Sequence, residues 1–385
     1  MLVQYSGWMT TALVFLAFFA AIFWTAVVVL PIRPAATGEK LDVTQTPPVT
    51  ADFSAITVLI PARNEAGTIA RTLSTVRQQS AELAVVVIDD QSTDQTAQIV
   101  ANEPGAIRLV GGTPTPSGWL GKVWALEQGL AAVKTPLILL LDADIELAPG
   151  FVASLQEKLQ LEQLALVSVM ARLRTSSVWE RLLVPAYIYF FKLLYPFALV
   201  NSQHSRVAAA AGGCILLRKT ALTQIGGFTA LRGSIIDDCA LAGLIKRAGN
   251  PIWLGLTNSV ISIRPYQTLS DFWNLVARSA FAELKFSIGR LVACTAGVLI
   301  LFCVPIIAPF VVRGTARYVA IVAAVAMLVS YLPVLRFYSL NPARVLTLPL
   351  VAIGYLAMTW NSALRYWFGK PTLWKDRAYR KIGDY

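Results

Sequence analysis

The feature that most constrains the fold is a run of aliphatic residues, Leu137 to Leu141, that stops at Asp142-Ala143-Asp144. A short run that is apolar on both faces is typical of a strand in a parallel sheet covered by helices on each side. Open sheets of this kind bind ligands beyond the carboxyl ends of their strands. Two carboxylates at such an end suit a hard divalent cation and a nearby hydroxyl group. Because Asp-x-Asp also occurs in solvated loops and at helix N-termini, the triplet alone leaves those alternatives open.

The same pattern of strand, loop and helix occurs earlier in the chain. Ile56 to Ile60 is a predicted strand that ends at Pro61, and Asn64-Glu65 are expected to open the helix that follows. Ala84 to Ile88 is a second apolar strand, and it ends at Asp89-Asp90. Three such strands separated by helices predict an α/β fold, a doubly wound sheet with its polar loops on one edge.

Composition places part of the chain in a membrane. The chain is 56% hydrophobic and 14% charged, with a mean hydropathy of +0.60, which is too apolar for a wholly soluble protein. Met9 to Leu30 is an uncharged segment long enough to cross a bilayer, and the first basic residues, Arg33 and Lys40, follow it. The positive-inside rule therefore places the soluble part in the cytosol, on a multi-pass protein of the cell (inner) membrane. The net charge of +11 indicates the membrane surface and no nucleic acid, since no basic helix or RNA-type aromatic pattern accompanies it.

The expected organisation follows from these segments. Residues 1–34 form an N-terminal membrane helix, 35–54 a linker, and 55–265 the α/β domain. Residues 179–200, which Pro185 and Pro196 interrupt, and residues 266–290 are rich in aromatic side chains and are expected to lie in the membrane interface.

Residues 291–385 form a C-terminal membrane region with a basic tail. The region contains three apolar stretches, and if all three crossed the membrane the tail would lie outside, against the charge rule. The last stretch, Val345 to Met358, is the shortest and contains Pro349. We therefore predict that this stretch is re-entrant or interfacial.

Several ordered segments carry a resemblance to a known family. TVLIPARNE, VVVIDDQSTDQT, LLLDADIEL and IIDDCALA, at residues 57–65, 85–96, 139–147 and 235–242, resemble family 2 glycosyltransferases of the GT-A fold. GWLGKVWAL and AAAGGCILLRK, at residues 118–126 and 209–219, are similar to the membrane-bound hopene-associated members. The resemblance implies a nucleotide-sugar-binding domain and an inverting transfer from a nucleoside diphosphate sugar. The closer likeness implies a lipid acceptor in hopanoid biosynthesis.

The resemblance also implies residues for the donor and a metal ion. Pro61, Arg63 and Glu65 would line the nucleotide pocket, and Asp90 would hydrogen-bond the base, for which uracil is usual. Asp142 and Asp144 would hold the ribose and a divalent metal ion, Mg²⁺ or Mn²⁺.

Other residues would act on the reacting groups. Asp238 would be the general base, with Asp237 beside it, and Lys122 would stabilise the departing diphosphate. Without the resemblance, a solvated lysine is the simpler interpretation of Lys122. Gly212 and Gly213 would approach the acceptor, although backbone geometry is the usual reason for glycine.

One departure from the family concerns Arg278. Processive members carry a Q/R-x-x-R-W motif near the membrane, whereas no Trp occurs in the corresponding residues 278–285. Single addition is therefore expected, and Arg278 would face the diphosphate or snorkel to lipid phosphate.

Two other functions stay open. The first is transfer to polyprenyl phosphate, and the second is a membrane transporter or binding protein without chemistry. Apolar stretches without charged residues and an intact series of acids argue against the second.

Overall fold

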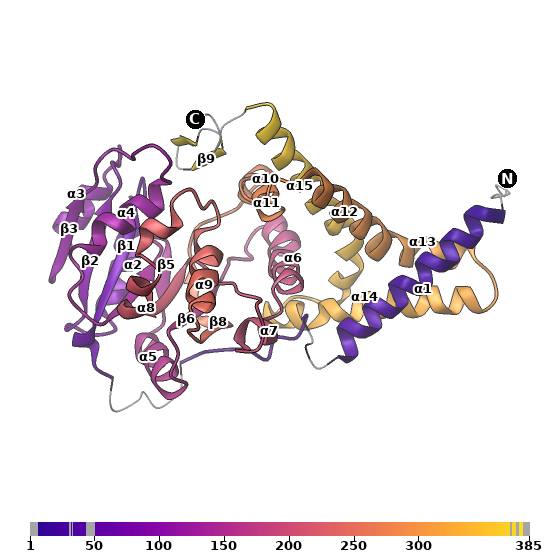
Figure 1. Cartoon of the computed structure of the whole chain (residues 1–385), viewed down its shortest axis with the longest axis horizontal. Coiled ribbons are helices and arrows are strands. Elements are labelled where there is room, and N and C mark those ends of the chain that lie inside the picture. The colour runs from indigo at the N-terminus through magenta and orange to yellow at the C-terminus, as the bar shows by residue number, and fades with distance from the viewer. Residues whose placement is uncertain are drawn as a thin grey trace. The chain divides into compact units, whose positions relative to one another are not determined.

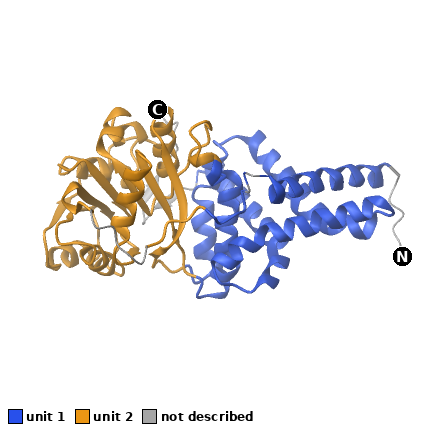
Figure 2. Ribbon diagram, turned by 90° about the horizontal axis from the view of Figure 1, so that it is seen from below, with its two compact units in different colours: residues 1–38, 175–198, 266–372 blue, residues 39–174, 199–265, 373–385 orange. Residues whose placement is uncertain are grey.

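The computed structural model describes residues 7–30, 32, 34–43, 51–369, 372–374 and 377–379. It divides into two units (Figure 2). Unit 1 comprises residues 1–38, 175–198 and 266–372, and unit 2 comprises residues 39–174, 199–265 and 373–385. Three parts of the sequence predictions lie outside the described residues: Arg33, residues 44–50 of the predicted linker, and much of the predicted basic tail, including Lys370, Lys375, Arg380 and Lys381.

The main sheet of unit 2 has the strand order β3-β2-β1-β4-β7-β6-β8-β5 among the described residues. Figure 1 shows β3, β2 and β1 side by side at one end of this sheet. The pairs β1-β2, β2-β3, β1-β4 and β6-β8 are parallel, whereas β7 runs antiparallel to β4 and β6, and β5 antiparallel to β8. The strands are β1 (Ile56–Ala62), β2 (Ala84–Asp89), β3 (Ile107–Gly111), β4 (Leu137–Leu141), β5 (Ile145–Leu147), β6 (Leu166–Arg172), β7 (Cys214–Arg218) and β8 (Ile252–Ser262). The three predicted strands and the α/β class are confirmed, and the sheet becomes mixed beyond β4.

Helices cover both faces of this sheet, which explains why its strands are apolar throughout. Helices α2 (Ile69–Arg77), α3 (Thr96–Asn102) and α5 (Phe151–Leu161) share a core with alternate residues of β1 such as Val58. Helix α4 (Gly121–Leu130) packs on the other face, where a methyl group at Gly129 would come within 2.6 Å of Leu59 and Ile88. Glycine therefore lets α4 approach the sheet closely. Short helices α8 (Lys219–Gln224) and η2 (Phe228–Leu231) lead to α9 (Asp237–Arg247), and η1 (Phe53–Ala55) precedes β1.

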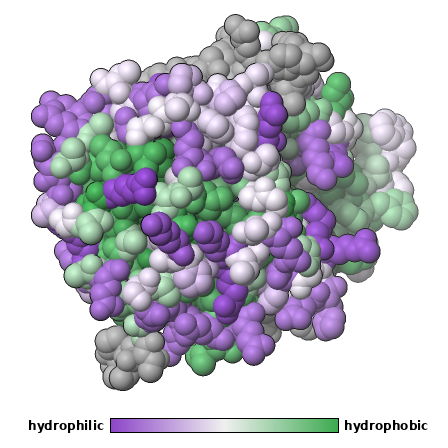
Figure 3. All heavy atoms as spheres, turned by 60° about the vertical axis from the view of Figure 1, so that its left-hand side comes forward, coloured by the Kyte–Doolittle hydropathy of each residue, from purple (hydrophilic) through white to green (hydrophobic). Residues whose placement is uncertain are grey.

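Helix α2 begins four residues later than the sequence predicts. Asn64 has a positive φ of 50°, so the chain makes a turn after β1 before it becomes helical at Ile69. Figure 3 shows a face with many polar side chains, on which apolar side chains gather in a patch to the left of the centre.

Part of the predicted linker is attached to the sheet. The backbone of residues 39–41 hydrogen-bonds Leu256 of β8, at 2.8 Å from Leu256 N to Glu39 O and 3.0 Å from Leu41 N to Leu256 O. Oδ1 of Asp42 accepts hydrogen bonds from Thr257 Oγ1 at 3.0 Å and from Asn258 N at 2.5 Å. Residues 39–43 are therefore part of unit 2 and do not form a free linker.

Unit 1 is helical. Its segments are α1 (Gly7–Val29), α6 (Val178–Leu194), α10 (Leu269–Ala277), α11 (Ala280–Glu283), α12 (Ile288–Val298), η3 (Leu299–Cys303), α13 (Val304–Val311), α14 (Thr315–Phe337), η4 (Pro342–Thr347) and α15 (Leu348–Trp367). Four stretches among the described residues are long and apolar enough to cross a membrane: Trp8–Val29, Ile288–Val311, Thr315–Phe337 and Pro342–Trp367. Large apolar side chains such as Phe15 and Phe310 are exposed on them, which is consistent with membrane association.

The last apolar segment is neither short nor interrupted by its proline. The segment runs over 26 residues, from Pro342 to Trp367, and Pro349 lies in the first turn of α15, where proline removes no intrahelical hydrogen bond. Helix α15 packs against α6, α10, α11 and α12, whereas α1 packs against α13 and α14. A re-entrant or interfacial position for α15 stays a prediction.

The predicted interfacial segment 179–200 contains one long helix and one short one. Helix α6 passes through Pro185 without interruption and ends at Leu194, before Pro196, and α7 (Phe197–Asn201) follows. A capping box begins α6, in which Ser177 Oγ accepts from Glu180 N at 3.0 Å and Glu180 Oε2 accepts from Ser177 N at 2.9 Å. The position of α6 in the membrane interface stays a prediction.

Candidate active site

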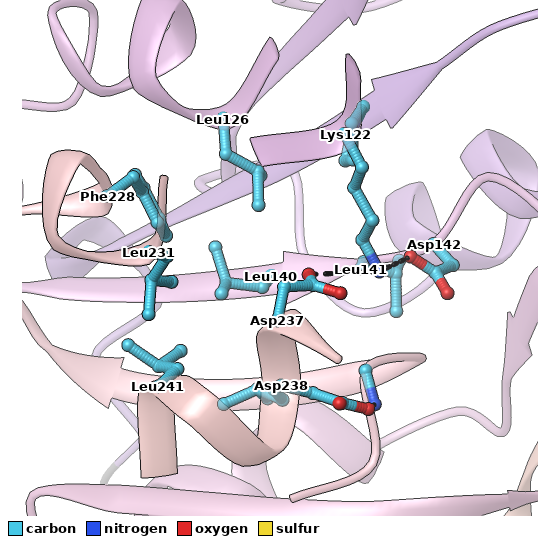
Figure 4. A pocket seen from close by; sticks show the side chains of 13 residues that line it. Lys122, Leu126, Leu140, Leu141, Asp142, Phe228, Leu231, Asp237, Asp238 and Leu241 are labelled. Atoms are coloured by element: carbon cyan, nitrogen blue, oxygen red, sulfur yellow. Dashed lines mark hydrogen bonds and ion pairs between the residues drawn. The ribbon is translucent and has the colours of Figure 1, made fainter. Parts of the chain in front are cut away.

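The predicted acidic residues come together at one end of the strands in the sheet of unit 2. Asp142 follows β4, and Gly212 precedes the neighbouring antiparallel strand β7, so the two strand ends meet. Asp237 and Asp238 begin α9 and line the same pocket (Figure 4). Pro61 of β1 also lines this pocket. The order of the strands reverses between β1 and β4, and ligands bind at such positions in α/β sheets.

Lys122 lies among these carboxylates. Its Nζ is 2.6 Å from Oδ1 of Asp142 and 3.9 Å from Oδ2 of Asp237, as the dashed lines in Figure 4 indicate. Burial lowers the pKa of Lys122, but the carboxylates of Asp142 and Asp237 outweigh burial and hold that pKa above its ordinary value. Lys122 is therefore a fixed positive charge at neutral pH, and the alternative of a solvated lysine is wrong.

Asp238 is held by two backbone amides. Gly212 N donates to Oδ2 at 2.7 Å, and Cys239 N donates to Oδ1 at 2.8 Å. Burial and the neighbouring Asp237 nevertheless raise the pKa of Asp238 to about 6. A carboxylate with this pKa is a stronger base than an ordinary one and is still ionised at neutral pH.

The pocket between these groups is small and has apolar walls. Its open space is about 10 Å³, room for one water molecule. Its apolar lining includes Leu126, Leu140, Leu141, Phe228, Leu231 and Leu241 (Figure 4). Apolar walls reduce dielectric screening, which strengthens the ion pair of Lys122 and disfavours ionisation of the carboxyl groups.

The loops after β1 and β2 are joined by Arg63. Its Nη1 donates to the carbonyl oxygens of Asp90 at 2.6 Å and of Gln91 at 2.9 Å. The side chain of Asp90 is fully buried, whereas the partly exposed Asp89 accepts a hydrogen bond from Ser92 N at 3.3 Å. Asp89 thus caps the turn, and a contact between the buried Asp90 and the base of a nucleotide stays a prediction.

Comparison with known proteins assigns this part of the chain to a family. Residues 57–226 match the model of the family described as Glycosyl transferase family 2. They form a family 2 glycosyltransferase domain. The fold is similar to that of a mannosyltransferase from Pyrobaculum calidifontis in complex with GDP-Man and Mn²⁺, with a TM-score of 0.53 and 20% identity over 92% of this chain and 99% of that one. The predicted GT-A type of fold is confirmed.

The chain is also similar to proteins from Staphylococcus. The chain is 38% identical to the 4,4'-diaponeurosporenoate glycosyltransferase of Staphylococcus haemolyticus over 94 residues, 24% of each chain. It is 28% identical to the protein of the same name from Staphylococcus aureus (strain USA300) over 228 residues, 58% of this chain and 60% of the relative. The chain therefore matches between a quarter and three fifths of the length of these relatives.

The family 2 domain offers part of a ligand set for a divalent cation. Oδ1 of Asp142 pairs with Lys122, and Oδ2 of Asp144 accepts from Ser262 Oγ at 3.1 Å and from Arg264 Nε at 3.0 Å. Within the described ranges, no three acidic, histidine or cysteine side chains come together as a metal site. Mg²⁺ is commonly held by one or two carboxylates together with substrate phosphates. The residues therefore fit a metal ion that binds together with a diphosphate.

Arg264 is the site residue that sequence reasoning missed. It follows β8, and its Nη2 lies 2.5 Å from Oε1 of Glu65 while its Nε contacts Asp144. Its position after a strand, like that of Asp142 after Leu137 to Leu141, could have marked Arg264 as a candidate, but it does not identify the partners of Arg264. The other predicted site residues belong to unit 2, except Arg278, which directly follows α10 of unit 1.

Gly213 has a structural explanation. Its carbonyl oxygen accepts a hydrogen bond from Asp142 N at 3.1 Å, and a methyl group on it would meet Ile145 Cδ1 at 3.2 Å. Close packing of the strand ends therefore accounts for this glycine, and the predicted contact with the acceptor stays a prediction for Gly212, Gly213 and Arg278.

Proposed function

We propose that the protein is a membrane-anchored, inverting glycosyltransferase that moves a sugar from a nucleoside diphosphate donor to a lipid acceptor. The observation that carries this proposal is that Lys122 and Asp238 both lie beside Gly212 in one pocket of unit 2. One is a fixed cation, and the other is a carboxylate with a pKa of about 6. A leaving diphosphate needs a cation such as Lys122, and an attacking hydroxyl group needs a base such as Asp238.

The reaction is a single displacement at the anomeric carbon. The acceptor oxygen forms a bond to this carbon while Asp238 takes the hydroxyl proton, and the diphosphate leaves with the electron pair of the broken bond. Lys122 stabilises the negative charge that develops on the diphosphate. Asp238 then returns its proton to water, which its pKa of about 6 favours at neutral pH.

A divalent cation, when bound, would supply further neutralisation of the diphosphate. Asp142 and Asp144 are the residues that would hold it, and Mg²⁺ or Mn²⁺ suits their oxygen atoms. Pro61, Arg63 and Glu65 would form the nucleotide side of the site, and Asp90 would meet the base of the nucleotide.

The membrane helices support a lipid acceptor. Long apolar helices in unit 1 would keep the protein at the bilayer, where a water-insoluble acceptor is found. The named relatives act, by their names, on 4,4'-diaponeurosporenoate, and the sequence resembles hopene-associated members of the family. We propose a hopanoid or another polyisoprenoid lipid as the acceptor, and a catalytic unit on the cytosolic side of the inner membrane.

Mass spectrometry of lipids tests this proposal. Cells that express the wild type and cells that express Asp238→Asn at the same level are extracted, and their lipids are compared. We expect a lipid that gains one sugar residue only with the wild type. A product that also contains phosphate and is cleaved by mild acid would indicate transfer to polyprenyl phosphate instead. Identical lipids in both strains would overturn the proposal.

A further inference from the structure

Arg264 connects two carboxylates that come from different parts of the family 2 domain. Glu65 lies in the loop after β1, and Asp144 lies between β4 and β5. The Arg264 guanidinium is 2.5 Å from Oε1 of Glu65 and 3.0 Å from Oδ2 of Asp144. The two carboxylate side chains are only 10% and 9% exposed, while that of Arg264 is 32% exposed.

The surroundings of the three residues fix their orientation. Ser262 Oγ donates to the same oxygen of Asp144 that Arg264 contacts, at 3.1 Å, and Ile263 N donates to the Asp144 carbonyl oxygen at 2.9 Å. Thr68 Oγ1 donates to the second oxygen of Glu65 at 3.0 Å. The planar guanidinium can meet both carboxylates at once, which the single ammonium group of a lysine in its place would do poorly.

We propose that Arg264 is a positioning residue that fixes the Asp144 carboxylate for a divalent cation and links it to Glu65 on the nucleotide side. With Oδ2 held by two donors, the plane of the carboxylate is set, and so is the direction of Oδ1. Hydrogen bonds of this kind behind a metal ligand are commonly worth 10- to 100-fold in metal affinity or activity. This inference rests on the proposed function.

Binding of Mn²⁺ measures this role without the transfer reaction. The full-length protein in detergent is titrated with Mn²⁺ at saturating UDP, and free Mn²⁺ is read by electron paramagnetic resonance. We expect Arg264→Met and Arg264→Lys to bind Mn²⁺ about 10- to 100-fold more weakly than the wild type. Ser262→Ala should show a smaller loss, and it guards against a folding defect because it removes a single hydrogen bond.

A control arginine variant and a double variant show whether an effect on Mn²⁺ binding is specific to Arg264. Arg71 pairs with Glu146 at 2.6 Å but is 62% exposed, so Arg71→Met should bind Mn²⁺ as the wild type does. Glu65→Gln should weaken binding alone and add no further loss to Arg264→Met, because Glu65 acts through Arg264. Thermal unfolding of each variant separates a local effect from general loss of structure.

The outcomes distinguish this inference from the proposed function. If the wild type binds Mn²⁺ and the Arg264 variants bind it equally well or more tightly, the positioning role is overturned while the proposed function stands. If the wild type binds no Mn²⁺ with UDP or with GDP, the metal assignment in the proposed function fails, and the role of Arg264 fails with it.

Discussion

The backbone amide of Gly212 donates a hydrogen bond of 2.7 Å to Oδ2 of Asp238. An added methyl group at Gly212 would meet this oxygen at 3.1 Å and Nζ of Lys122 at 3.2 Å. One residue without a side chain therefore lies between the proposed base and the proposed cation.

Gly212→Ala should slow transfer by displacing both groups. A misplacement of catalytic groups of about 1 Å costs about 100-fold, but the contacts at 3.1 and 3.2 Å require smaller shifts, so we expect a loss in kcat of less than about 100-fold. Gly111→Ala is the matched control, because a methyl group there meets nothing within 4 Å. Steady-state kinetics of both variants check the prediction, which fails if their rates are equal.

Asp238→Asn should bind the donor nearly as well as the wild type but transfer it at least about 100-fold more slowly. The substitution keeps the shape of the side chain and removes its basicity. Asp237→Asn should have a smaller effect, since Asp237 lies 3.9 Å from Lys122 and would only adjust the local charge. Donor binding and single-turnover transfer are measured separately, and near-normal transfer by Asp238→Asn would remove it as the base.

The pH dependence of transfer should report the ionisation of Asp238. Burial and Asp237 raise its pKa to about 6, so protonation inactivates the base as the pH falls through this value. We expect kcat/KM of the wild type to be half-maximal near pH 6 and to fall about tenfold for each further pH unit. Lys122 lowers the pKa of Asp238, so Lys122→Met should move the midpoint to higher pH. A midpoint near pH 4 would show an ordinary carboxyl group.

Removal of metal should stop the reaction. EDTA should silence the wild type, and added Mg²⁺ or Mn²⁺ should restore it. Asp144→Ala should abolish transfer even with excess metal, whereas Asp52→Ala, an exposed residue that accepts from Ser54 Oγ at 2.6 Å, should not. Full activity in metal-free buffer would contradict the metal assignment.

The side of the membrane can be tested at Ser117, an exposed residue of unit 2. Because Arg33 and Lys40 follow the first membrane segment, the rule of positive charges predicts a cytosolic position. Ser117→Cys, in a background without accessible native cysteines, should resist an impermeant thiol reagent in intact cells and react after lysis. Labelling of intact cells would reverse the orientation.

The first half of the sheet could be predicted because short runs of neighbouring residues identify its strands and the loops after them. The runs at 56–60, 84–88 and 137–141 are apolar on both faces, and polar loops follow them at the same edge. The role of Lys122 is harder to predict, because its ion pair with Asp142 spans 20 positions and no pattern of neighbouring residues indicates that pair.

The second half of the sheet could not be predicted in the same way. Strand β7 runs antiparallel between β4 and β6, and a helical segment of unit 1 separates β6 from β7 in the sequence. Arg264 reaches Asp144 across 120 positions, so its role depends on strand pairing and not on spacing. Tertiary contacts of this length are set by how the strands pair, and the sequence near Arg264 does not encode that pairing.

The attachment of Asp42 to Asn258 also bears on how the protein is made. These residues are 216 positions apart, so the edge of the sheet cannot close until β8 has been synthesised. By then α1 has left the ribosome and residues 175–198 of unit 1 have been made. Contacts at such separations form late in folding. A nascent chain therefore has no complete site before residue 264 emerges, when its first helix is already available to the membrane.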